Sequence, residues 1–133
     1  MKTRFLKNFI LFFWQLIQNI IGLVFLLFML NDIVGQYDYR DTRVYKLKKF
    51  SGVSLGNFIF IGHDKDIITL LHEYGHHKQS VILGPLYIII VGIPSVLHVL
   101  VRRVIRKLFG KNIWTYYSFY TEKWADKLVN IKR

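Results

Sequence analysis

The chain has 133 residues, enough for one domain and too few for two, and it contains no cysteine, which excludes disulfides and thiolate metal sites. Hydrophobic residues make up 53% of it, and 19 Lys and Arg against 8 Asp and Glu give a formal net charge of +11. Because no nucleic-acid-binding motif is present and the basic residues flank apolar segments, this charge predicts membrane lipid as a partner and excludes nucleic acid.

The first predicted element is an apolar segment, residues 5–30, which is long enough to cross a bilayer as one helix. Its apolar core is longer than that of a signal peptide, and no small-residue cleavage site follows it. We therefore expect an uncleaved transmembrane anchor. Three amides, Gln15, Gln18 and Asn19, follow helical spacing within this segment and predict a polar stripe that contacts another helix.

The next segment, residues 31–50, is polar and lacks apolar periodicity, which predicts a juxtamembrane loop. Residues 54–62, S-L-G-N-F-I-F-I-G, are apolar between glycines and predict one strand. Asp66 then has the position of a helix-capping residue. We expect that helix to run to about Leu83, because Gly84 and a proline follow.

A second apolar segment, residues 85–101, is interrupted by Gly92 and Pro94. Two alternatives stay open for it: a single crossing, or a re-entrant hairpin whose bend lies at the interruption. A basic, amphipathic stretch follows at the predicted interface. Residues 112–131 are aromatic-rich and have the pattern of a C-terminal helix. The predicted fold is thus a mostly α integral membrane protein in which residues 1–133 form one membrane-embedded domain.

The predicted helix before Leu83 carries the motif H-E-x-x-H as His72, Glu73 and His76. Residues four apart lie one turn apart on the same helix face, so the two imidazoles point toward one spot, as two ligands of a zinc ion must. Glu73 is turned about 100 degrees from His72. It is therefore placed to accept a proton from a water at the metal, as a general base does.

A catalytic zinc needs a third protein ligand, and the chain offers a second glutamate, Glu122, within E-K-W-A-D. We expect Glu122 to be that ligand. Asp126 lies one helical turn later on the same face. From there it can accept a hydrogen bond from the far nitrogen of a histidine ligand and fix the tautomer of that ring.

The pair H-E-Y-G-H and E-K-W-A-D resembles the gluzincin zinc metalloproteases, the thermolysin-like group, whose pattern is H-E-x-x-H followed by E-x-x-x-D on a later helix. This resemblance implies Zn²⁺ ligands at His72, His76 and Glu122, a general base at Glu73 and a supporting carboxylate at Asp126. It also implies that the strand before the helix is an edge strand that aligns a peptide or protein substrate.

A longer pattern, which covers about residues 54–128, resembles small, poorly characterised bacterial membrane proteins. It combines G-N-F-I-F, H-E-Y-G-H-x-x-Q-S, L-G-P-L-Y, G-I-P-S and T-E-K-W-A-D. Together with the anchor at residues 5–30, this resemblance implies a bacterial inner (cytoplasmic) membrane location. Residues 54–131 form the metalloprotease-like region.

The proposed ligands set a condition on the topology, because ligands of one metal must meet at one depth. If residues 85–101 crossed the bilayer, His76 and Glu122 would begin on opposite sides. Either that segment is a re-entrant hairpin, which we favour as the simpler arrangement, or the C-terminal helix folds back to the level of the zinc.

The remaining histidines have other predicted roles. His77 faces away from His72 and is expected at a surface or interface, and His63 is expected in a loop. His98 lies inside the second apolar segment, where we expect it to pair with an amide or the backbone. Three tyrosines near the C-terminus are most simply an interfacial aromatic belt; these are Tyr116, Tyr117 and Tyr120.

The sequence thus predicts a membrane-bound zinc metalloprotease that hydrolyses peptide bonds. Two alternatives from other classes remain: a non-catalytic membrane protein stabilised by a structural zinc or polar cluster, and a basic membrane-surface interaction module in which the motif is accidental.

Overall fold

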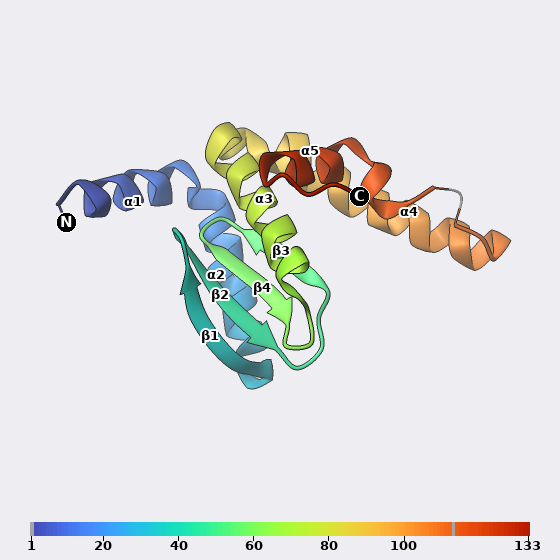
Figure 1. Ribbon diagram of the computed structural model, residues 1–133, viewed down its shortest axis with the longest axis horizontal. Helices are drawn as coiled ribbons and strands as arrows, with labels where there is room; N and C mark the ends of the chain where they lie inside the picture. Colours follow the sequence, from blue (N-terminus) through green and yellow to red (C-terminus); the bar gives the residue numbers. More distant parts are fainter. Residues whose placement is uncertain (1, 113) are drawn as a thin grey trace.

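The computed structural model describes residues 2–112 and 114–133, which form long helices around a small sheet (Figure 1). Helix accounts for 65% of the structure, so the predicted helical class is right in proportion, but the sheet is larger than the one strand expected. The α-helices are α1 (Lys2–Trp14), α2 (Leu16–Met29), α3 (Ile67–Leu83), α4 (Ile93–Phe109) and α5 (Tyr120–Leu128). The strands are β1 (Ile33–Tyr39), β2 (Thr42–Leu47), β3 (Gly52–Leu55) and β4 (Phe58–Gly62). Short helical turns are η1 (Leu30–Asp32), η2 (Gly84–Leu86), η3 (Ile88–Gly92) and η4 (Tyr116–Ser118).

The predicted single helix over residues 5–30 is wrong, because α1 and α2 meet at an angle of 86°. Gln15 lies at the bend, and the amides there are buried and bonded to other parts of the fold. Gln18 Nε2 donates to the carbonyl of Gly84 at 2.6 Å, and Ser80 Oγ donates to Gln15 Oε1 at 2.6 Å. The predicted polar contact with another helix is therefore present, to α3 and its C-terminal end, and it fixes the bend.

The predicted loop at residues 31–50 is also wrong, since β1 and β2 form an antiparallel pair there. The sheet has the order β1-β2-β4-β3, and β2 pairs with β4 in parallel. In β2, Val44 and Leu47 are buried while residues between them are partly exposed. An exposed ion pair of Arg43 with Asp38 gives this segment the polar composition of a loop.

The predicted strand at residues 54–62 is two antiparallel strands, β3 and β4, joined by a turn. Gly56 in that turn has φ 64°, a conformation that favours glycine, which explains why a run of strand-forming residues reverses there. β4 is buried within the sheet, whereas β3 pairs on one side only among the described residues. The part of the predicted strand that lies at the sheet edge is therefore β3.

Helix α3 begins and ends as expected. Asp66 caps it by accepting a hydrogen bond from the backbone N–H of Thr69 at 2.9 Å, and Gly84, with φ 53°, ends it. One side of α3 packs on the sheet through Leu70 and Tyr74, which join Val44, Ile59 and Ile61 in the core cluster.

The favoured re-entrant hairpin at residues 85–101 is wrong, because the chain is helical without a break from Ile88 to Phe109. Its first turn, η3, is π-helical and leads directly to Pro94. A wide turn before a proline accommodates the missing N–H without bending the chain back. Among the described residues, this is the one single helix long and apolar enough to cross a membrane.

The two halves of the predicted site meet because α5 folds back beside α3 (Figure 1). A fold-back of the C-terminal helix was part of the second arrangement considered; the membrane crossing in that arrangement stays a prediction. The C-terminal helix is shorter than expected and starts only after η4. Gly75 makes the close approach possible: a Cβ there would collide with the backbone of Ala125 in α5.

Candidate metal centre

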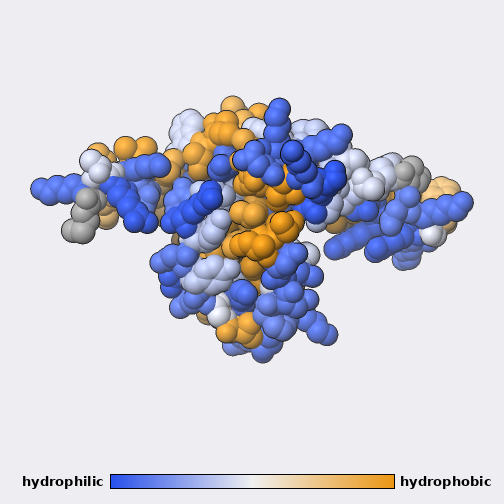
Figure 2. Space-filling view, in the orientation of Figure 1, coloured by the Kyte–Doolittle hydropathy of each residue, from blue (hydrophilic) through white to orange (hydrophobic). Residues whose placement is uncertain are grey.

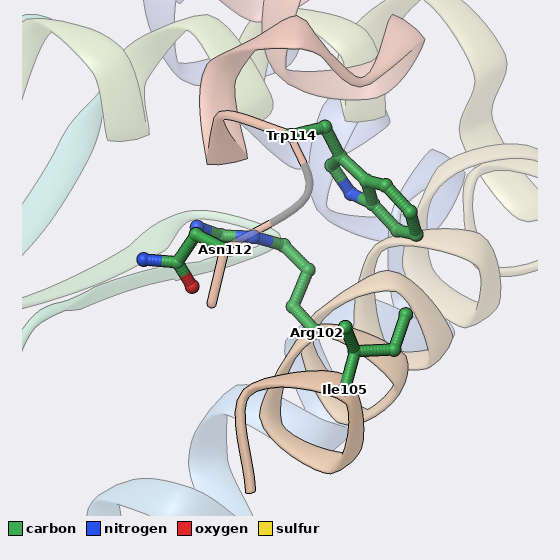
Figure 3. A pocket seen from close by; sticks show the side chains of 4 residues that line it. All are labelled: Arg102, Ile105, Asn112 and Trp114. Atoms are coloured by element: carbon green, nitrogen blue, oxygen red, sulfur yellow. The ribbon is translucent and has the colours of Figure 1, made fainter. Parts of the chain in front are cut away.

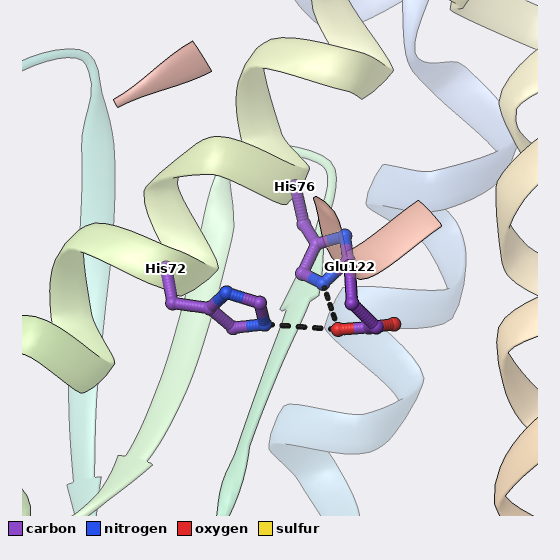
Figure 4. A group of neighbouring side chains, drawn as sticks. All are labelled: His72, His76 and Glu122. Carbon is purple, nitrogen blue, oxygen red and sulfur yellow. Dashed lines mark hydrogen bonds and ion pairs between the residues drawn. The ribbon is translucent and has the colours of Figure 1, made fainter. Parts of the chain in front are cut away.

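Three predicted ligand residues come together between α3 and α5 (Figure 4). His72 and His76 project from one face of α3 toward Glu122 near the start of α5. Glu122 Oε2 lies 2.9 Å from His72 Nε2 and 3.1 Å from His76 Nε2. All three ligand atoms lie within 4.8 Å of one another, and all three residues are buried.

The far nitrogen of each imidazole has an acceptor of its own. His72 Nδ1 lies 2.7 Å from Asp126 Oδ1, and His76 Nδ1 lies 2.7 Å from Gln79 Oε1. A carboxylate only accepts, and the Gln79 amide nitrogen already donates to the carbonyl of Thr121 at 2.7 Å, so both Nδ1 atoms donate. In a neutral ring, each Nε2 then carries an unshared lone pair, and this lone pair points at Glu122.

The charges of the site follow from this arrangement. Burial lowers the pKa of His76, but the hydrogen bond and charge of Glu122 outweigh it, and the pKa rises to about 9. The pKa of His72 is raised by the same balance of burial against Glu122. Burial raises the pKa of Glu122, but the two imidazoles outweigh it and lower the pKa overall. The site therefore favours positive charge between these three side chains.

A divalent cation fits this group by its chemistry. Two neutral Nε2 atoms and one carboxylate oxygen are three acceptors that converge with no donor among them, and a cation or extra protons must lie between them. A tetrahedral zinc with bonds of about 2.0–2.1 Å holds its ligand atoms roughly 3.3 Å apart, close to the spacing around Glu122 Oε2. The buried group can thus hold a metal ion.

Glu73 lies beside this group and faces a cavity of about 600 Å³. His76, Glu122 and Tyr116 line the same cavity. Burial raises the pKa of Glu73, the charge of Glu122 raises it further, and the two imidazoles oppose both effects. No hydrogen bond from the described residues reaches its carboxylate, so its oxygens are available to a molecule in the cavity.

The cavity walls come from β3 on one side and from α4 on the other, with Ile21 of α2. The α4 wall is mostly aliphatic and includes Ile93, Val96 and Leu100. Gly52, the first residue of β3, lies against Glu73, and a Cβ there would collide with the Glu73 carboxylate. The absence of a side chain at Gly52 lets the edge strand approach the candidate base.

The structure adds positioning residues that the sequence did not predict. Thr121 Oγ1 donates to Glu122 Oε1 at 3.1 Å, and Ser95 Oγ of α4 donates to Thr121 Oγ1 at 2.9 Å. This chain of bonds links Glu122 to α4. A sequence signal existed for Gln79, since it follows His76 by three residues and lies on the same face of the helix. None existed for Ser95, whose distance in sequence from Thr121 is large.

The other histidines lie outside the group. His77 is buried where α3 meets the sheet, so of its two predicted positions the surface is excluded and an interface remains: its Nδ1 donates to the carbonyl of Gly56 at 2.8 Å, and its Nε2 lies 3.3 Å from Asp41. His63 lies in a loop, as predicted. His98 stacks on Phe119 with ring centroids 4.2 Å apart, in place of the expected pairing with an amide or the backbone.

A second, smaller pocket is lined by none of the predicted ligand or catalytic residues (Figure 3). It lies between α4 and the segment after it and leaves no room for a water-sized molecule. Its four lining residues are Arg102, Ile105, Asn112 and Trp114.

The three tyrosines predicted to form an interfacial belt have separate contacts. Tyr116 lines the large cavity, and Tyr120 donates to the carbonyl of Ile90 at 2.6 Å. Tyr117 packs edge-on against His72, with ring centroids 5.2 Å apart. The belt itself stays a prediction.

Comparisons of the chain with models of protein families, with curated proteins and with solved structures found no match.

Proposed function

We propose that this protein is a membrane-bound zinc metallopeptidase of the gluzincin type, with His72, His76 and Glu122 as the zinc ligands. The observation that carries this proposal is the convergence of the three ligand atoms beside a cavity that Glu73 also lines. A structural zinc is enclosed by four protein ligands, whereas a catalytic zinc has three and an open position. The cavity beside His76 and Glu122 favours the catalytic alternative.

In this proposal, bound Zn²⁺ supplies a Lewis acid that polarises a peptide carbonyl and lowers the pKa of a water. The Glu73 carboxylate takes a proton from the attacking water, whose oxygen forms a bond to the carbonyl carbon. The C–N bond then breaks, and Glu73 gives the proton to the leaving nitrogen. Burial raises the pKa of Glu73 above its ordinary value, which makes its carboxylate a stronger base for the first of these steps.

The cavity also indicates how a substrate would bind. An extended peptide can pair with the edge of β3 by backbone hydrogen bonds, and Gly52 would place that peptide beside Glu73. The aliphatic wall from α4 favours an apolar side chain of the peptide. A bacterial inner membrane is the proposed location, supported by the long apolar helix from Ile88 to Phe109.

The decisive experiment measures metal content and peptide hydrolysis in the same preparations. We expect one zinc per chain in the wild type and loss of zinc in His72→Ala and Glu122→Ala. Glu73→Gln should retain zinc and lose turnover of a mixture of quenched-fluorescence peptides.

Each result separates the proposal from one alternative. A Glu73→Gln variant that keeps both zinc and wild-type turnover would contradict the role of Glu73, and a wild type without any hydrolysis would favour a structural zinc. Absence of stoichiometric zinc in the wild type under metal-replete conditions would reject the metal site itself. Asp64→Asn is a matched control, because Asp64 is an exposed carboxylate outside the site.

A further inference from the structure

The helices α1, α2 and α4 each expose many large apolar side chains. In α1, Phe5, Phe9 and Phe13 follow helical spacing and are 74%, 53% and 55% exposed. In α2, Val24, Leu27 and other residues are similarly exposed. Soluble proteins rarely leave contiguous apolar areas of this extent in water, which indicates a partner surface.

The exposed apolar residues of α4 form a stripe along the whole helix. They recur at intervals of three and four residues, which is the spacing of one helix face, and they are between 49% and 71% exposed. The residues of this stripe are Ile93, Leu97, Leu100, Val104 and Leu108. An apolar stripe that continues to the last turn is typical of a helix lying in the plane of a membrane surface.

The helix lengths also favour an in-plane arrangement. α1 has 13 residues and α2 has 14, which at 1.5 Å per residue is about 20 Å for each, less than the roughly 30 Å of a bilayer core. The helix from Ile88 to Phe109 is long and apolar enough to cross a membrane, but four basic residues lie near its end, so its uncharged part ends after about 20 Å. These residues are Arg102, Arg103, Arg106 and Lys107.

The charges of these helices complement an anionic lipid surface. α1 contains Lys2, Arg4 and Lys7, and neither α1, α2 nor α4 contains an acidic residue. α1 and α4 extend toward opposite ends of the longest axis, while α2 lies behind the sheet (Figure 1). Figure 2 shows many polar side chains along both ends of the molecule, with some apolar ones beside them.

We propose that α1, α2 and α4 dock flat on an anionic bilayer from one side, without crossing it. The apolar stripes enter the boundary between headgroups and acyl chains, and the basic side chains beside them contact lipid phosphates. The bend at Gln15 is required for this arrangement, because it turns α1 away from α2. Ile93, Leu97 and Leu100 of the α4 stripe also line the large cavity, so the docked face includes part of one wall of that cavity. Lipid binding is measured without peptide hydrolysis, so docking stands or fails separately from the proposed function.

Flotation of the full chain with preformed vesicles tests the partner. We expect binding to phosphatidylglycerol-containing vesicles that exceeds binding to phosphatidylcholine vesicles and weakens with salt. Phe9→Glu combined with Val104→Glu should lower binding about tenfold or more. Val34→Glu is the matched control, since Val34 is 53% exposed, like Phe9, but lies on β1. Glu73→Gln should bind like the wild type.

Single cysteines test the topology, and the natural absence of cysteine makes their labelling specific. In sealed vesicles of the expressing cells, an impermeant maleimide should label Thr3→Cys, Asp64→Cys and Lys111→Cys from the same side. Protection of Thr3→Cys or Lys111→Cys where Asp64→Cys is labelled would overturn the proposal in favour of a spanning helix. Equal binding to both lipid compositions, or equal loss of binding in the Val34→Glu control, would also overturn it. Circular dichroism of each variant verifies that the helices are retained.

Discussion

Two faces of α3 carry buried histidines beside carboxylates, yet the faces differ in what they can bind. Toward α5, the Nε2 atoms of His72 and His76 converge on one oxygen of Glu122. Toward the sheet, His77 donates to a backbone carbonyl and has one carboxylate, Asp41, 3.3 Å away. The face toward α5 therefore brings together three ligand atoms, whereas the face toward the sheet has one imidazole, which contacts a backbone carbonyl and one carboxylate.

This difference shows that burial of a histidine next to an acid is not enough to indicate a metal site. Asp41 also accepts a hydrogen bond from Tyr74 at 2.8 Å, and the imidazole of His77 beside it is the chief cause that lowers its pKa. That cluster connects α3 to the β1–β2 turn and has the partners of a structural contact. The cluster toward α5 has more acceptors than donors, which is the property that a cation requires.

We expect the largest effect on zinc affinity, and it should distinguish His76 from its neighbour His77. Removal of an outer hydrogen-bond partner already costs a metal site about 10–100-fold in affinity, so loss of a ligand in His76→Ala should cost more than about a hundredfold. His77→Ala should leave zinc affinity unchanged, because His77 faces the sheet. Competition with a chromophoric chelator measures both affinities. Equal losses in the two variants would contradict the assignment of the faces.

The pH dependence of the metal-free protein gives the next effect. The pKa of His76 is raised from its ordinary value to about 9, so its contribution to stability is complete below about pH 6.5 and is lost as pH rises through 9. The loss should be on the order of 3 kcal/mol, measured by denaturant unfolding in detergent solution with a chelator present.

Two controls sharpen this test. His76→Ala should flatten the dependence, while His77→Ala should preserve it. Zinc should reverse the trend, because protons and the cation compete for the same Nε2 atoms and a higher pH favours the cation. A metal-free stability that does not fall between about pH 6.5 and pH 9 would contradict the proposed charges.

The carboxylate beside each histidine cluster, Asp126 on one face of α3 and Asp41 on the other, provides another comparison of the two faces. Asp126→Ala should lower zinc affinity about 10–100-fold, since Asp126 holds the Nδ1–H of His72 at 2.7 Å. Asp41→Ala should leave zinc affinity unchanged and lower stability by about 1–3 kcal/mol, because it leaves the buried His77 without its carboxylate. Titration with zinc and denaturant unfolding measure the two quantities, and a zinc effect in Asp41→Ala would show that the faces are coupled.

The convergence of the site could be predicted from the sequence because its geometry is local. His72 and His76 share a helix face by their spacing, and so do Glu122 and Asp126 by theirs. The meeting of these two helices could only be stated as a condition. It depends on α5 folding back over Gly75, a tertiary contact across about fifty residues of chain that helix periodicity does not encode.

The failures have tertiary causes as well. The bend between α1 and α2 depends on bonds from Gln15 and Gln18 to residues more than sixty positions away. The β1–β2 pair resembles a loop in sequence because charged side chains cover its exposed face. The partner of His77 was missed for the same reason, since its carboxylate, Asp41, lies in the turn between those strands.

The smallest expected effect compares two glycines, one at the contact of the two helices and one outside it. In Gly75→Ala the new Cβ meets the backbone of Ala125, so the variant should lose about 1–3 kcal/mol of stability and bind zinc more weakly as α5 shifts. In Gly92→Ala the nearest atoms lie 3.8 Å away, so the added methyl fits and should stabilise the helix by up to about 1 kcal/mol. Denaturant unfolding and zinc titration of both variants measure the difference. Equal stability in the two would show that α3 and α5 can separate without loss, and the meeting of His76 with Glu122 would then need another cause.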